Sequence, residues 1–292
     1  MTNDPFFVVG TGRSGTTLFR NLLRHHPTIF IPRETHWLPI LWAEFGASEV
    51  PTASIQATVD RVFMAKGRTP FERIMREDGL DGDEIRSSIR DRLGVTTTVA
   101  GFHRGLLGLL AEQTRRTQIG DKTPDYGFFM ATLLELFPES RFIHLVRDGR
   151  DVAISMSKVL SFRILAALEL TRWWDVALDS EYRRGLDAAD RELPPERFLE
   201  LWLSRVRGIR EEAMKIPVDR YLEITYEDLL AAPVDVLRQV NAFLVLQGDE
   251  SWIHEAAAMV RPGNRDRNRD NPIRAALGCR YPRELKAEGY SP

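Results

Sequence analysis

The sequence has few cysteines, no long apolar run near its start and little net charge. Its 292 residues include a single cysteine, Cys279, so no disulfide can form within the chain. The first apolar run, Phe6–Val9, is too short for a signal-peptide core or a membrane span, and no basic residue precedes it. The formal net charge of −2 gives no general attraction to nucleic acid. We therefore expect a cytoplasmic protein with no integral membrane segment and no nucleic-acid partner.

The sequence does contain enough apolar residues for a sizeable core. Hydrophobic residues make up 43% of the chain and charged residues 28%. Short apolar segments typical of buried parallel strands recur along it. These segments are 6–9, 29–32, 118–122, 141–147 and 221–225. We expect a single α/β domain over 1–292, with three layers (α/β/α) in which helices flank a central parallel sheet.

Most of the chain between these segments has helical periodicity, with apolar residues at spacings of three and four. The predicted helices cover 52–66, 83–93, 97–115 and 125–137. We expect the block 52–115 to be a helical insertion that covers the functional site. The last stretch, 261–292, is rich in arginine and is broken by glycine and proline, which predicts an irregular tail.

The best-defined motif is a glycine-rich turn between the first strand and a helix, reading Gly-Thr-Gly-Arg-Ser-Gly-Thr-Thr over 10–17. Unpaired N–H groups at such a helix start favour a bound phosphate. The turn nearly matches the P-loop G-x-x-x-x-G-K-[ST], but Thr16 occupies the lysine position. Because that lysine reaches the outer phosphates of a nucleoside triphosphate, its loss argues against a triphosphate donor. Arg13 supplies the cation instead, and Ser14 and Thr17 add hydroxyl donors.

A second strand-turn-helix segment is suited to a second anion. Arg147 ends a strand and Ser155, eight residues later, lies on the following helix. A guanidinium and a hydroxyl in this arrangement can hold a phosphate between them. Arg150 lies between them, and the sequence also allows it to pair locally with Asp148 or Asp151.

Two charged side chains follow strand ends, where open α/β sheets place their ligands. Glu34 comes just after the second strand segment, and a carboxylate there is a candidate general base. The sequence equally allows Glu34 to be a helix N-terminal charge. Lys122 ends another strand segment and would point at the same cleft as Arg13 if the sheet is parallel. Lysine at such a place is otherwise a solvated surface charge.

These motifs resemble the sulfotransferases that use 3′-phosphoadenosine 5′-phosphosulfate (PAPS). The run Arg13–Leu18 resembles their 5′-phosphosulfate-binding loop, and Arg147 with Ser155 resembles their 3′-phosphate-binding segment. The resemblance implies a P-loop-like sulfotransferase fold and transfer of a sulfuryl group from PAPS to an acceptor hydroxyl without a metal. It also implies that Ser14, Gly15, Thr16 and Thr17 hold the 5′-phosphate, that Arg147 and Ser155 hold the 3′-phosphate, and that Tyr226 lies near the nucleotide.

The same resemblance implies catalytic roles for Glu34, Lys122 and Arg13. Glu34 falls on the glutamate proposed as catalytic base in tyrosylprotein sulfotransferases, while Lys122 and Arg13 would neutralise charge on the transferring group. Cytosolic members have Lys-Thr-His where this chain has Lys-Thr-Pro, so Pro124 replaces their histidine base. The sequence does not decide between Glu34 and a histidine as the base. For His103 we expect a packed or exposed helix position rather than catalysis.

Two other functions fit parts of the pattern. A P-loop kinase of a small molecule would share the glycine-rich turn, although it would need the missing lysine and Mg²⁺. A non-catalytic nucleotide-binding module would use the arginine-rich tail, 261–292, as a contact surface. For a sulfotransferase, the acceptor could be a sugar, a lipid, a phenol or a peptide tyrosine. The sequence indicates no oligomeric state.

Overall fold

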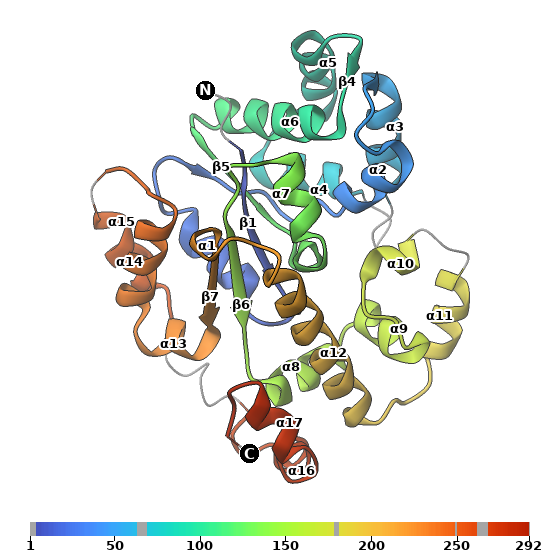
Figure 1. The fold of residues 1–292 in the computed structure, drawn as a ribbon, viewed down its shortest axis with the longest axis vertical. Helices are drawn as coiled ribbons and strands as arrows, with labels where there is room; N and C mark the ends of the chain where they lie inside the picture. The colour runs from blue at the N-terminus through green and yellow to red at the C-terminus, as the bar shows by residue number, and fades with distance from the viewer. Residues whose placement is uncertain (1–3, 63–68, 178–180, 249, 262–267, 292) are drawn as a thin grey trace.

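A five-stranded parallel sheet lies at the centre of the structure, a computed structural model (Figure 1). The described residues are 4–62, 69–177, 181–248, 250–261 and 268–291. In sheet order the strands are β2 (Ile29–Phe30), β5 (Gln118–Lys122), β1 (Phe6–Gly10), β6 (Phe142–Val146) and β7 (Tyr221–Thr225). Each neighbouring pair is parallel. The five predicted strands and the parallel sheet are therefore confirmed.

Alternating side chains of β1 pack into two different cores, as expected for a strand covered on both faces. Phe6 and Val8 belong to one apolar cluster, and Phe7 and Val9 to another. The first cluster is completed by α1 (Thr16–Leu23), α13 (Tyr226–Ala231), α14 (Pro233–Phe243) and α15 (Ser251–Ala258). The second is completed by helices between α2 (Leu38–Phe45) and α7 (Met130–Leu136) and by the end of α12 (Pro195–Ala213). The three-layer α/β/α architecture is thus confirmed.

The insertion after α2 is helical, with more elements than the sequence indicated. It contains α3 (Thr52–Arg61), α4 (Pro70–Asp78), α5 (Gly82–Leu93) and α6 (Val99–Gln113). The helix α4 was not predicted, and its start is fixed by a capping box between Thr69 and Glu72. The predicted helix over 97–115 begins only at Val99, because Thr97 pairs in a two-stranded antiparallel ribbon of β3 (Val50–Pro51) and β4 (Thr96–Thr97). Residues 63–66 of the first predicted helix lie outside the described residues.

The predicted helix over 125–137 is wrong in its first half. The chain forms a 3₁₀ helix, η1 (Pro124–Phe128), before α7 begins at Met130. The Asp125 carboxylate accepts hydrogen bonds from the Trp173 backbone N–H and from buried Arg205, so a tertiary contact overrides the helical periodicity here.

The C-terminal part also differs from the expected irregular tail. It contains α16 (Pro272–Arg280), which Asn271 caps, and α17 (Pro282–Ala287). These helices pack beside α8 (Gly149–Met156) and α12 at the lower end of Figure 1. Three further helices, α9 (Leu160–Leu168), α10 (Trp173–Ala177) and α11 (Glu181–Ala189), precede α12. Across all the described segments, no helix combines the length and apolar character that membrane crossing requires.

Candidate active site

The predicted site residues lie along one edge of the sheet, because the carboxyl ends of its parallel strands all face the same way. The five strands contribute in sheet order. The contributions are Glu34 after β2, Lys122 at the end of β5, the turn 11–15 after β1, Arg147 after β6 and Tyr226 after β7. Residues from widely separated parts of the sequence therefore share a single row.

The turn after β1 is built to leave backbone N–H groups open at the start of α1. Gly12, Arg13 and Gly15 all have positive φ, and Gly15 is the N-cap of α1 without any side-chain cap. A Cβ at Gly15 would lie 2.3 Å from Cδ2 of Tyr226, so only glycine fits there. Ser14 is fully buried, and its Oγ has no partner among the described residues. An unsatisfied hydroxyl beside a helix N-terminus suits an anionic oxygen.

The second predicted anion site lies directly against the first. Arg13 Nε donates a hydrogen bond to Ser155 Oγ at 3.0 Å. The Arg147 guanidinium lies 4.5 Å from the ring centroid of Tyr226, a cation–π arrangement. Tyr226 is therefore packed between Gly15 and Arg147. Arg147 Nε has no partner within the part of the chain that the structure describes.

Acidic residues and the C-terminal helices hold the start of α8. Arg150 pairs with Asp148 at 2.6 Å, which is the local alternative that the sequence allowed for this arginine. Arg274 on α16 adds ion pairs to Asp148 at 2.9 Å and to Asp151 at 3.4 Å. Asp151 also lies 3.4 Å from Arg147. The C-terminal segment thus anchors the helix that carries Ser155.

Glu34 and Lys122 form an ion pair at the other end of the row. Lys122 Nζ donates to Glu34 Oε1 at 2.7 Å, and the lysine side chain is almost fully buried. His36 Nε2 lies 3.4 Å from Glu34 Oε2. Burial alone would raise the pKa of Glu34, but the nearby charges of Lys122 and His36 hold that pKa well below its usual range. Glu34 is therefore a carboxylate at neutral pH.

Sequence reasoning missed a buried polar cluster beneath this ion pair. Thr35, Asp121 and Thr123 are fully buried, and their hydroxyl and carboxylate groups are bonded to one another. His103, which the sequence left without a function, lies in the same cluster. Burial and the charge of Arg104 lower the pKa of His103 to about 3. His103 is therefore neutral and inaccessible, which confirms the expectation of a packed residue.

Arg205 is a second feature that the sequence did not reveal. The Arg205 side chain is fully buried, and its Nε donates to the Thr11 carbonyl oxygen at 2.7 Å. This hydrogen bond links α12 to the turn after β1. The guanidinium also bonds Asp125 and lies over the rings of Phe128 and Phe162. An arginine on an amphipathic helix is normally predicted to lie on the surface, so no local sequence pattern indicated that Arg205 is buried.

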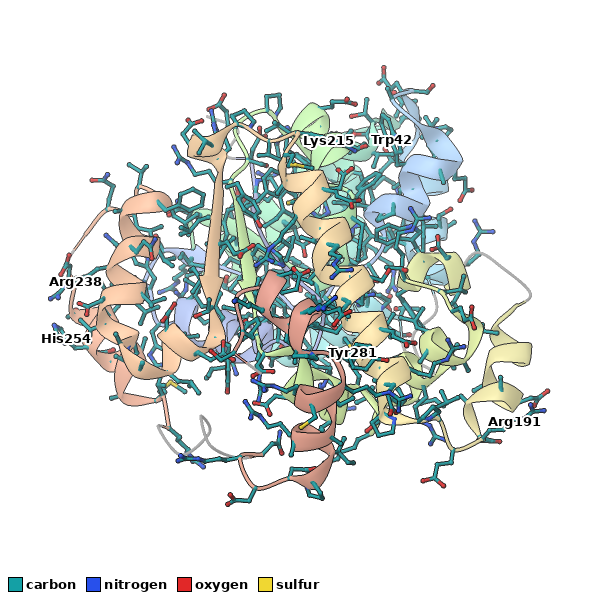
Figure 2. All side chains as sticks on the ribbon, turned by 60° about the horizontal axis from the view of Figure 1, so that its bottom comes forward. Trp42, Arg191, Lys215, Arg238, His254 and Tyr281 are labelled. Atoms are coloured by element: carbon teal, nitrogen blue, oxygen red, sulfur yellow. The ribbon has the colours of Figure 1, made fainter. Side chains whose placement is uncertain are left out.

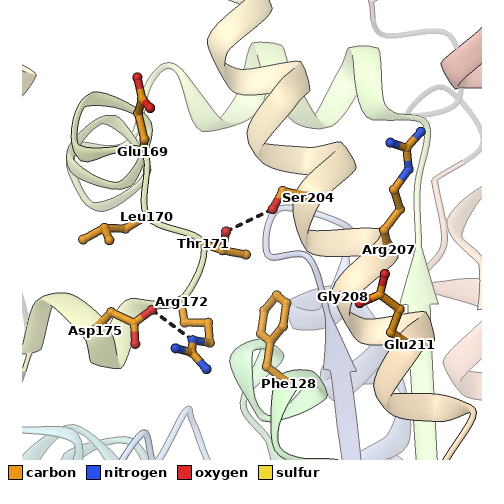
Figure 3. A pocket seen from close by; sticks show the side chains of 10 residues that line it. All are labelled: Phe128, Glu169, Leu170, Thr171, Arg172, Asp175, Ser204, Arg207, Gly208 and Glu211. Atoms are coloured by element: carbon orange, nitrogen blue, oxygen red, sulfur yellow. Dashed lines mark hydrogen bonds and ion pairs between the residues drawn. The ribbon is translucent and has the colours of Figure 1, made fainter.

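A pocket of about 570 Å³ lies between α12, η1 and the segment 169–175 that follows α9 (Figure 3). It is lined by Phe128, Glu169, Leu170, Thr171, Arg172, Asp175, Ser204, Arg207, Gly208 and Glu211. Figure 3 shows Thr171 and Ser204 bonded to each other across it, at 3.0 Å. None of the predicted site residues lines this pocket, and neither does any described residue of the insertion 52–115. Among the described residues, no group of three or more His, Cys, Asp or Glu could hold a metal ion.

Comparison with known proteins identifies relatives of this chain. The chain is 23% identical over 260 residues to the protein-tyrosine sulfotransferase of Drosophila melanogaster, covering 88% of this chain and 41% of that protein. It is 29% identical over 142 residues to the omega-hydroxy-beta-dihydromenaquinone-9 sulfotransferase Stf3 of Mycobacterium bovis, covering 48% of this chain and 31% of that protein. The chain therefore spans less than half the length of these curated relatives.

Solved structures share the fold. The sulfotransferase domain of the Synechococcus PCC 7002 olefin synthase superposes with a TM-score of 0.58 at 21% identity, covering 99% of this chain and 97% of that one. The sulfotransferase domain from the curacin biosynthetic pathway gives a TM-score of 0.56 at 20% identity, covering 95% and 97%. A sequence model described as the sulfotransferase family matches residues 5–250, a range that holds every residue of the row along the sheet edge. On that match, the chain belongs to the sulfotransferase family.

Proposed function

We propose that this protein transfers a sulfuryl group from PAPS to an acceptor hydroxyl. The observation that carries the proposal is the row of side chains at the carboxyl edge of the sheet, with two cationic anion sites side by side. PAPS carries a phosphosulfate at one end and a ribose 3′-phosphate at the other. It therefore needs two separate anion sites rather than one cradle for a triphosphate.

The residues at the edge fit that donor. The N-terminus of α1 and the unpartnered Ser14 hydroxyl suit the 5′-phosphate, together with Thr16 and Thr17 in the first turn. Arg147, whose Nε lacks a partner among the described residues, and Ser155 suit the 3′-phosphate. Arg13 donates to Ser155, so its cation lies between the two sites.

The reaction that these residues would perform is a single displacement at sulfur. The acceptor oxygen bonds to sulfur, the bond between sulfur and the bridging oxygen breaks, and the leaving group is adenosine 3′,5′-bisphosphate. Glu34 takes the proton from the acceptor hydroxyl. Lys122 and Arg13 neutralise the negative charge that grows on the bridging oxygen and the transferring group.

The contact between Glu34 and Lys122 adds a condition to this mechanism. With Lys122 bound, the pKa of Glu34 lies well below its usual range, which makes the carboxylate a weak base. The sulfuryl group of PAPS, which the bisphosphate lacks, would compete with Glu34 for the Lys122 ammonium group. As Lys122 moves toward the donor, the pKa of Glu34 rises, so donor binding would strengthen the base before the acceptor reacts.

The test is calorimetric titration with adenosine 3′,5′-bisphosphate in EDTA, compared with ATP in the presence of Mg²⁺. We expect tight binding of the bisphosphate without metal, followed by formation of a sulfate ester when PAPS and a suitable acceptor are supplied. Preference for Mg·ATP would instead support a small-molecule kinase. Bisphosphate binding without product from any acceptor would support a non-catalytic nucleotide-binding module.

The relatives indicate which acceptors should be tested first. Their names specify a protein tyrosine and a menaquinone hydroxyl as acceptors. A phenol-bearing peptide and a long-chain alcohol should therefore be tested beside simple sugars. We propose that the insertion 52–115 shapes the acceptor side of the site, since α2 and this insertion follow Glu34 directly in the chain.

A further inference from the structure

The residues next to Glu34 and Lys122 in sequence tie their two chain segments together. Thr35 follows Glu34, while Asp121 and Thr123 flank Lys122. All three flanking residues are fully buried, whereas Glu34 is only half-buried. The ion pair of Glu34 and Lys122 thus lies next to a buried polar layer formed by the residues that flank the pair in sequence.

The bonds within this layer run directly from one segment to the other. Thr35 Oγ1 donates to Asp121 Oδ2 at 2.7 Å, and the Thr35 backbone N–H donates to Thr123 Oγ1 at 2.9 Å. Thr123 Oγ1 in turn donates to Asp121 Oδ1 at 2.8 Å. One carboxylate and two hydroxyls therefore fix the backbone on both sides of Lys122 relative to the residue after Glu34.

Aromatic residues complete the layer with consistent donor directions. Because Thr35 Oγ1 donates to Asp121, it accepts from Tyr126 OH, which lies 2.6 Å away. Trp37 Nε1 donates to His103 Nδ1 at 3.0 Å, so the proton of the neutral imidazole is on Nε2, which lies 3.4 Å from Asp121 Oδ2. Apart from His103 Nε2, which has no hydrogen-bond partner among the described residues, each polar group of this layer has its complement, and such pairing makes a buried network rigid.

Such a network specifies geometry more than it adds stability. Burial of a carboxylate costs free energy, and apolar packing of similar volume is often at least as stabilising. Hydrogen bonds of fixed direction, in contrast, hold side chains within the narrow tolerances that catalysis requires. Here the fixed atoms are one residue away from the two charged groups at the edge of the sheet.

We propose that Thr35 and Asp121 are positioning residues that fix the backbone segments of Glu34 and Lys122 side by side, so that the two groups pair before the donor binds and remain beside the reacting atoms afterwards. The proposal rests on the proposed function for its catalytic consequence, but the contact itself can be measured without any activity. Loss of the Thr35 hydroxyl should loosen the ion pair while leaving donor binding intact, because neither Thr35 nor Asp121 lies in the turn after β1 or on α8.

The first experiment measures the ion pair by trace acetylation of lysines with mass-spectrometric readout. Lys122 is the reporter, and Lys215, exposed at the end of α12 (Figure 2), is the internal reference. In Thr35→Val we expect acetylation of Lys122 to rise about tenfold, the effect of losing one buried hydrogen bond. Thr35→Ser, which keeps the hydroxyl, should match the wild type. Thr58→Val is the matched control, since the hydroxyl of buried Thr58 bonds Glu44 and Arg61 rather than any residue of the layer beneath Glu34 and Lys122.

The second experiment is a double-mutant cycle on turnover. If Thr35 acts through Glu34, then Thr35→Val in a Glu34→Gln background should lose little further activity, and affinity for the bisphosphate should be unchanged. Lys122 acetylation equal to that of the wild type in Thr35→Val, while Glu34→Gln raises it, would overturn the proposal. Fully additive losses of turnover would also overturn it. A protein that forms no sulfated product would refute the proposed function, and the acetylation result would still decide the positioning role.

Discussion

Arg13 Nε donates a hydrogen bond to Ser155 Oγ at 3.0 Å, which joins the turn after β1 to the helix after β6. From the sequence, we expected Arg13 to lie at the phosphosulfate end of PAPS and Ser155 at its 3′-phosphate. Their contact, with Tyr226 packed between Gly15 and Arg147, joins the two proposed anion sites into a single continuous surface. A ligand with two anionic groups would be recognised by both sites together, so loss of either site should weaken the binding of the whole ligand.

Arg147→Ala should weaken binding of adenosine 3′,5′-bisphosphate about 10- to 100-fold. The reason is the loss of charge-assisted hydrogen bonds to the 3′-phosphate. Titration calorimetry of the variant measures the change directly. Arg238→Ala, at an exposed position on α14 (Figure 2), is the control and should bind like the wild type. Unchanged affinity in Arg147→Ala would show that this arginine does not contact the ligand.

Glu34→Gln should lower turnover roughly 10²-fold or more, because the amide cannot accept the proton of the acceptor. Affinity for the bisphosphate should stay nearly constant. Steady-state kinetics with PAPS and the best acceptor from the panel provide the measurement. His36→Asn tests the remaining histidine beside the carboxylate, and it should retain most activity. A larger loss in His36→Asn than in Glu34→Gln would move the role of base to the histidine.

Gly15→Ala should abolish nucleotide binding and destabilise the fold by more than the backbone strain alone. Gly15 has a φ of +98°, and an added Cβ would lie 2.3 Å from the Tyr226 ring. Gly79→Ala is the matched control, with a φ of +67° and no atom within 4 Å of the added Cβ. The control should lose about 1–2 kcal/mol in urea unfolding, the cost of left-handed backbone for alanine. Equal losses in the two variants would show that the Tyr226 contact relaxes without cost.

Local patterns were sufficient to predict the strands and the glycine-rich turn after β1. The run Phe6–Val9 is apolar on both faces because β1 is buried on both faces, and the glycines that follow it fix a turn whatever the rest of the chain does. The residues Glu34 and Lys122 could be selected because each follows a strand. Their meeting at 2.7 Å, however, requires β5 to lie between β2 and β1, and a sheet order of this kind is a property of the whole fold.

What the sequence could not show depends on distant partners. Thr35 and Asp121 are 86 residues apart, and neither has a local feature that marks it as buried and bonded. Arg205 has the spacing of a solvated residue on an amphipathic helix, yet it is enclosed by Asp125 and the rings of Phe128 and Phe162. The same contact to Asp125 explains why the helix predicted over 125–137 begins as a 3₁₀ turn.

Arg205→Met should destabilise the protein by about 3–5 kcal/mol, because it leaves the buried Asp125 carboxylate without its partner and frees the Thr11 carbonyl. Arg207→Met, two residues further on the same helix, removes a half-exposed arginine whose buried partner Glu288 keeps its ion pair with Arg210, so it should cost about 1 kcal/mol or less. Urea unfolding of both variants gives the comparison. Similar losses of stability in the two variants would mean that the apolar packing of a methionine side chain compensates for the lost hydrogen bonds of Arg205.

The last prediction concerns the pH dependence of stability at Asp121. Burial raises the pKa of Asp121 to about 6, although the hydroxyls of Thr35 and Thr123 and the charges of His36 and Lys122 oppose the shift. Between about pH 4 and pH 6 the unfolded chain has therefore lost a proton that the folded chain keeps. Raising the pH through this window favours unfolding, by up to about 1.4 kcal/mol per pH unit for one proton.

Asp121→Asn removes this titration, so its free energy of unfolding should decline less than that of the wild type as pH rises from about 5 to about 6. The variant also loses part of the buried network, but that loss is an offset that does not change with pH. The lowered pKa of Glu34 contributes stability that is lost as the pH falls through the ordinary range of a glutamate, at about 4.3, so the two curves are compared above about pH 5, where this contribution is nearly complete in both proteins. Urea unfolding at half-unit pH steps measures the difference between the two curves. Parallel curves would mean that Asp121 ionises in the folded protein as readily as in the unfolded chain, and that the buried layer beneath Glu34 and Lys122 is more hydrated than its contacts indicate.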